Sequence, residues 1–121
     1  MKIKILDPEF AICQINDLEE INYDAEFLFI SKTDEEISLV CIANAIPVNA
    51  IKYDLGWAAF RIDAVLDFSL VGILARITSL LAANQIGIFA ISTYNTDYVL
   101  VKKEHLSIAT NILSKNGYEI I

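Results

Sequence analysis

The fold of this chain is decided by the stretch AAFRIDAVLDFSLVGILARITSLLAANQIGIFAIST, residues 58–93. Apolar and polar side chains alternate over 58–65, a pattern that predicts a half-buried strand. Over 70–84 the apolar residues recur at helical spacing, and Ser69 is a suitable N-cap for a helix beginning directly after it. The β-branched and aromatic run at 86–93 predicts a second strand.

The residues that follow extend this pattern to six elements. A turn is expected at 94–97, a strand at 98–101, a helix at 105–114 that Gly117 terminates, and a last strand at 118–121. The order β-α-β-β-α-β predicts an α+β, ferredoxin-like unit. In this unit two helices cover one face of a four-stranded antiparallel sheet.

The predicted strand at 86–93 is apolar on both faces, because Ile88 and Ala90 alternate with Phe89 and Ile91. The helices can bury only one face of such a sheet. Hydrophobic residues make up 55% of the 121 residues, so the chain is small and rich in apolar surface. We therefore expect a homodimer or a higher even oligomer.

The first half of the chain resembles a degenerate copy of the second half. A shift of 61 positions places Phe29 on Ala90 and Glu36 on Asp97 without gaps, which indicates an internal repeat. The first strands align at a shift of only 50, so the first repeat lacks most of a helix, and residues 17–26 can hold two or three turns at most. The predicted domains are a degenerate first repeat at 1–56 and a second domain at 57–121.

The composition of the chain indicates which kinds of partner it can bind and in which cellular compartment it is expected. The net charge of −7 disfavours nucleic acid, because an acidic surface repels a phosphate backbone. Residues 77–96 carry no charge, but they contain polar side chains and change periodicity midway, so no membrane span is expected. Cys13 and Cys41 lie in apolar runs without CxxC spacing, which favours reduced core thiols in a cytoplasmic protein.

The sequence contains no recognisable set of catalytic residues. His105 is the only histidine, so neither a zinc site nor a Ser-His-Asp triad can be assembled. The four glycines form no nucleotide-binding loop. Pairs such as Asp63 and Asp67 have no feature that marks them as an acid–base pair. We expect no enzyme activity, no cofactor and no metal.

Several motifs resemble one known family. The motif GILARI at 72–77, with IGI at 86–88, is similar to the ACT domains at the regulatory end of aspartate kinases. DFSLVG at 67–72 and ISTYNTDY at 91–98 resemble small stand-alone bacterial tandem-ACT proteins and the ACT halves of the cytosolic arginine sensors of the CASTOR type. TDEEISLVC at 33–41 is similar to the first-repeat motif of that group. The resemblance implies amino-acid binding at ACT–ACT interfaces.

The resemblance implies a site between the 69–73 turn of one ACT unit and the 92–97 hairpin of another. Backbone N–H groups at the helix start would bind an α-carboxylate, and Gly72 would allow the ligand to approach the backbone. Asp97 would pair with an ammonium group or a basic side chain. The predicted ligand-binding residues are Ser69, Leu70, Val71, Gly72, Ile73, Ser92, Thr93, Tyr94 and Asp97.

Simpler interpretations stay open for these residues. Gly72 could serve tight helix–sheet packing, Ser69 could be only an N-cap, and Asp97 could be only a turn residue. Two functions follow: a non-catalytic regulatory module that binds a free amino acid, or an ACT-like interaction module that binds a protein target and no ligand. The sequence does not name the amino acid.

Overall fold

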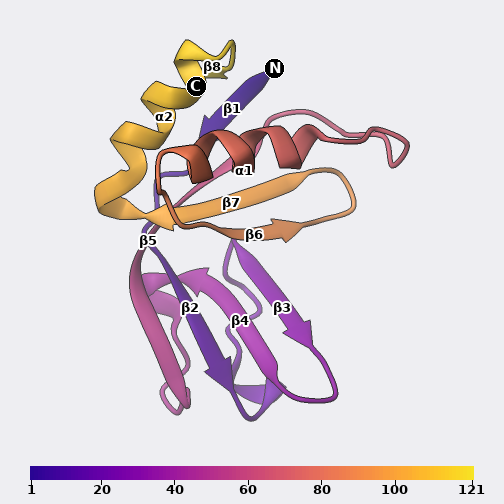
Figure 1. The fold of residues 1–121 in the computed structure, drawn as a ribbon. Helices are drawn as coiled ribbons and strands as arrows, with labels where there is room; N and C mark the ends of the chain where they lie inside the picture. The colour runs from indigo at the N-terminus through magenta and orange to yellow at the C-terminus, as the bar shows by residue number, and fades with distance from the viewer. The chain divides into compact units, whose positions relative to one another are not determined.

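The computed structural model describes residues 1–121 and contains eight β-strands and two α-helices (Figure 1). The α+β class predicted from the sequence is confirmed. The chain divides into two compact units. Unit 1 consists of Met1–Asp7 and Ala58–Ile121, and unit 2 consists of Pro8–Trp57. Neither α-helix is long and apolar enough to cross a membrane.

Unit 1 contains a five-stranded sheet and both α-helices. The strand order is β6-β7-β5-β1-β8, and β1 runs antiparallel to β5 but parallel to β8. Its elements are β1 (Lys2–Ile5), the second half of β5 (Lys52–Ile62), α1 (Ile73–Ala83), β6 (Phe89–Ser92), β7 (Asp97–Lys102), α2 (Leu106–Lys115) and β8 (Glu119–Ile120), with a 3-10 turn at Lys103–His105.

The position of β1 differs from the predicted domains 1–56 and 57–121. This strand lies between β5 and β8, so residues 1–7 pack with the second half of the chain. Ile3 is fully buried in the core of unit 1 beside Ile62. The repeat begins only at Phe10, so the sequence offered no local signal for the long-range pairing of β1.

The core of unit 1 lies between the helices and one face of the sheet. Ile77 and Leu81 of α1 are completely buried, as are Ala109 and Leu113 of α2. They pack against apolar side chains of β1, β5 and β7. The predicted helix start is wrong by three residues, because α1 begins at Ile73 and not at 70. Its N-cap is Gly72 and not Ser69.

Unit 2 is an all-β unit. The strand order is β3-β4-β2-β5, and every described pairing in it is antiparallel. Its elements are β2 (Phe10–Ile15), β3 (Leu28–Lys32), β4 (Ile37–Ile42) and the first half of β5, with 3-10 turns at Leu18–Glu20 and Ala43–Ala45. Within the limit of two or three helical turns predicted for 17–26, the structure has a single 3-10 turn, which Asp17 caps by accepting from the Glu19 N–H at 2.9 Å. Leu18 and Ile21 of this segment pack in the core of unit 2 without forming a longer helix.

The two hairpins show the same turn, but at a shift of 60 positions and not 61. In β3–β4 the Thr33 N–H donates to the Glu36 carbonyl at 2.9 Å, and in β6–β7 the Thr93 N–H donates to the Thr96 carbonyl at 2.8 Å. Glu36 therefore corresponds to Thr96, and Ile37 corresponds to Asp97. The predicted match of Glu36 with Asp97 is wrong, and it adds nothing to a functional role for Asp97.

Candidate functional site

A cavity of about 360 Å³ lies in unit 1 between the start of α1 and the turn that joins β6 to β7. Two segments that are distant in sequence, 66–75 and 92–97, form its walls. Its lining residues are Leu66, Asp67, Phe68, Leu70, Gly72, Ile73, Leu74, Ala75, Ser92, Thr93, Tyr94, Asn95, Thr96 and Asp97.

The first wall is a tight turn that leads into α1. The Asp67 Oδ1 atom accepts from the Ser69 N–H at 2.8 Å, and the Leu70 N–H donates to the Asp67 carbonyl at 3.0 Å. The backbone hydrogen bond from Ser69 lowers the pKa of Asp67. Gly72 then adopts a φ of +79°, a left-handed conformation that glycine reaches without steric cost. The turn therefore directs the chain into α1, which begins at the cavity.

The helix start supplies unpaired donors, at positions different from those predicted. The Arg76 N–H donates to the Gly72 carbonyl at 3.0 Å and forms the first hydrogen bond of the helix. The N–H groups of Ile73, Leu74 and Ala75 consequently have no acceptor within α1. Leu70, predicted to offer such a donor, already uses its N–H in the Asp67 turn. The aligned peptide dipoles add partial positive charge at this end of the helix.

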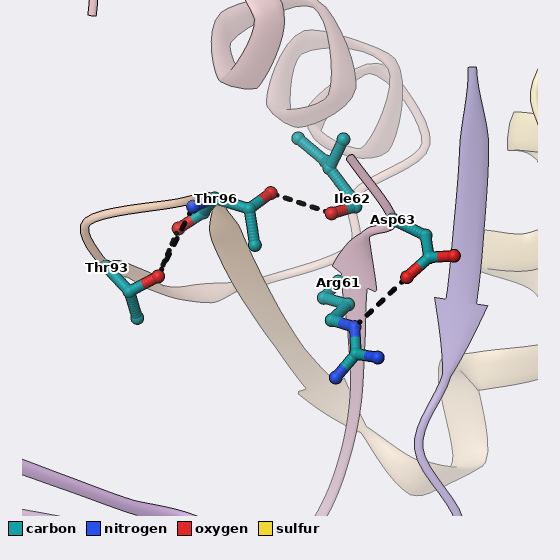
Figure 2. Close-up of polar contacts among 5 residues, drawn as sticks. All are labelled: Arg61, Ile62, Asp63, Thr93 and Thr96. Carbon is teal, nitrogen blue, oxygen red and sulfur yellow. Dashed lines mark hydrogen bonds and ion pairs between the residues drawn. The ribbon is translucent and has the colours of Figure 1, made fainter. Parts of the chain in front are cut away.

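The second wall is the β6–β7 turn, which is held by its own hydroxyl groups. The Thr93 hydroxyl donates to the Thr96 carbonyl at 3.0 Å, and the Thr96 N–H donates to the Thr93 hydroxyl at 3.3 Å. The buried Thr96 hydroxyl donates to the Ile62 carbonyl at 2.7 Å and ties the turn to β5 (Figure 2). The Leu66 N–H donates to the Asn95 carbonyl at 2.7 Å and links the two walls.

Apolar side chains surround the mouth of the cavity. The rings of Phe68 and Tyr94 meet edge to face, with centroids 5.1 Å apart and planes at 77°. Both rings are mainly exposed, at 76% and 82%, and Val71 is 90% exposed. Large apolar side chains exposed together often mark a binding surface.

The charges of the lining are negative. Asp67 and Asp97 are its carboxylates, and it contains no lysine, arginine or histidine. No group of three or more His, Cys, Asp or Glu residues is placed to hold a metal ion. The cavity thus offers carboxylates on two sides and helix-start N–H groups on one wall, an arrangement suited to an ammonium and a carboxylate together.

The structure brings most of the predicted residues to this cavity. Leu70, Gly72, Ile73, Ser92, Thr93, Tyr94 and Asp97 line it, whereas Ser69 and Val71 do not. Both predicted segments belong to unit 1, and they line one cavity within it. That a second ACT unit supplies the facing wall stays a prediction. The remaining seven lining residues were not predicted. Asp67 could have been found, because an Asp two residues before a Ser is typical of a side-chain-closed turn.

Two family models match this chain, one in each half. A family model described as ACT domain matches residues 52–115. The chain belongs to the ACT-domain family. A second model, described as an N-terminal domain, matches residues 8–49, which fall within unit 2. Among curated proteins, none matches.

Several solved structures share the fold of this ACT-domain chain. Protein Atu0741 from Agobacterium tumefaciens is 32% identical, with a TM-score of 0.85 over 99% of this chain and 91% of its own. VC0802 from Vibrio cholerae, described as of unknown function and a possible transport protein, is 18% identical, with a TM-score of 0.73 over 93% and 86% of the two chains. A structure of aspartokinase α and β subunits is 16% identical, with a TM-score of 0.64 over 95% and 96%.

Proposed function

We propose that this ACT-domain chain is a regulatory module that binds a free amino acid in the cavity of unit 1 and catalyses no reaction. One observation carries the proposal: the free N–H groups that begin at Ile73 and the carboxylate of Asp97 line the same cavity. An amino acid carries a carboxylate and an ammonium, which match these two groups in charge. A volume of about 360 Å³ lies within the range of small-molecule sites.

The family supports a regulatory role. The likeness to aspartokinase subunits shows the fold, and an ACT-domain chain without a catalytic set is suited to sensing. The matching strand orders β6-β7-β5 in unit 1 and β3-β4-β2 in unit 2 support a tandem pair in which unit 2 carries 3-10 turns in place of α-helices. The proposed arrangement is therefore an intact ACT unit that binds the ligand, together with a reduced one.

A dimer forms a second part of the proposal. Five large apolar side chains lie exposed beside or near the cavity mouth, and burying them against a second copy would cover the ligand. They are Val65, Phe68, Leu70, Val71 and Tyr94. The same surface favours the second candidate function, an interaction module that binds a protein target and no amino acid.

A thermal-shift panel of the twenty amino acids separates these functions. A ligand present at a hundred times its dissociation constant stabilises the folded state by about 2.7 kcal/mol. We expect one amino acid, or a chemically related few, to raise the melting temperature in a saturable manner. A panel in which no amino acid changes the melting temperature would reject the amino-acid function and leave the interaction module.

A further inference from the structure

A second cavity, of about 390 Å³, lies in unit 1 next to the same β6–β7 turn. Thr93, Asn95 and Thr96 line both cavities, so the turn is a shared wall. The lining residues of the second cavity are Arg61, Ile62, Asp63, Ala64, Val65, Thr93, Asn95, Thr96 and Tyr98. The proposed function makes no use of this cavity.

The second cavity differs from the first in holding a guanidinium. The Arg61 Nε atom lies 3.4 Å from the Asp63 Oδ1 atom, and both side chains are partly exposed. Figure 2 shows the two terminal guanidinium nitrogens on the side away from Asp63. A hydrogen bond to the Tyr98 side chain is the main reason that the pKa of Arg61 is raised. Arg61 is thus held by two neighbours and stays charged.

Donors remain free in this cavity. A guanidinium has five N–H donors, and the contacts of Arg61 with Asp63 and Tyr98 do not occupy all of them; the 3.4 Å contact with Asp63 is not a bidentate pairing. The Asn95 side-chain amide makes no hydrogen bond within the chain, although its carbonyl accepts from Leu66. Arg61 and Asn95 therefore offer several donors toward one volume.

We propose that the second cavity binds a small organic carboxylate through Arg61. A carboxylate can accept from the remaining guanidinium donors, and the Asn95 amide can donate to the same ligand. Asp63 is the opposing charge in the lining, so it lowers the affinity for an anion. This proposal does not depend on an amino acid binding in the first cavity.

The probe is succinate, titrated at constant ionic strength into ¹⁵N-labelled protein. We expect saturable shifts of the Arg61 Nε–H signal and of the backbone amides of 93–96, because the turn is a wall of the cavity. Arg61→Gln should weaken succinate binding roughly tenfold or more, as expected for the loss of hydrogen bonds from a charged donor. Asp63→Asn should tighten it, because the change removes a negative charge and releases the Nε donor.

Lys4→Gln is the matched control. Lys4 is the direct partner of Arg61 on β1 and does not line the cavity. An equal loss in Lys4→Gln and Arg61→Gln would show charge attraction without a site and overturn the proposal. Unchanged affinity in Arg61→Gln, or weaker affinity in Asp63→Asn, would also overturn it. Asp63→Asn keeps the arginine, so it decides the outcome if Arg61→Gln does not fold.

Discussion

The Ser92 hydroxyl donates to the Asp97 Oδ1 atom at 2.5 Å, and the two residues are direct partners in the β6–β7 register. A short bond to a carboxylate is a strong, charge-assisted one. It fixes the orientation of Asp97 at the cavity and leaves the Oδ2 atom without a partner in the chain. An oriented carboxylate with one free oxygen is a suitable acceptor for an ammonium group.

Asp97→Asn tests this role directly. The substitution keeps the shape of the side chain and removes its charge, so the affinity for the amino acid found by the panel should fall about ten- to hundredfold. Isothermal calorimetry measures the change. Glu119→Gln, which removes an exposed carboxylate outside the cavity, should leave the affinity unchanged. An unaltered dissociation constant in Asp97→Asn would make Asp97 a turn residue only.

Gly72→Ala should destabilise the fold through its backbone and not through a clash. A Cβ at Gly72 would meet nothing within 4 Å, which removes the interpretation that this glycine allows tight packing. Its φ of +79° costs about 1–2 kcal/mol for a residue with a Cβ. Gly87→Ala is the control, because a Cβ there also meets open space and the backbone is not left-handed. Equal free energies of unfolding for both variants in urea would contradict the backbone explanation.

Val71→Asp should convert the proposed dimer to a monomer. Val71 is almost fully exposed beside the cavity mouth, and a charge buried in an apolar interface is strongly unfavourable. Val48→Asp is the matched control, because Val48 is at least as exposed as Val71 but lies in unit 2. Light scattering at micromolar concentration measures the mass. A wild-type mass of 13.5 kDa would show a monomer and remove this prediction.

The stability of the chain should fall above pH 9 because of Cys41. Burial raises the pKa of this thiol from its ordinary value of 9.0 to about 12. Between these values the thiol ionises in the unfolded chain and stays neutral in the folded one, so rising pH favours unfolding. The free energy of unfolding should decrease by about 1.4 kcal/mol per pH unit more than in Cys41→Val. Urea titrations at pH 8, 9, 10 and 11 measure both slopes, and parallel slopes would refute the assignment.

Much of unit 1 could be predicted from the sequence, because its signals are local. The alternation at 58–65 and the helical spacing beyond 70 depend on neighbouring residues, and the structure has a strand ending at Ile62 and a helix over Ile73–Ala83. Half of the cavity lining was predicted from family motifs on two short segments. That the two segments of one unit line a common cavity depends on the fold, since motifs carry no distances.

The sequence did not predict which distant segments pair with one another. The insertion of β1 between β5 and β8 depends on burying Ile3 among residues of the second half, which no local pattern encodes. The two hairpin sequences align most apolar residues on apolar residues at a shift of 60 or of 61 positions. Only the observed strand pairing shows that Asp97 corresponds to Ile37 and not to Glu36. The sequence by itself determined the type of most elements in unit 1. The tertiary structure decided that the Thr96 hydroxyl reaches the Ile62 carbonyl, because a hydrogen bond forms only where folding has brought both groups within about 3 Å.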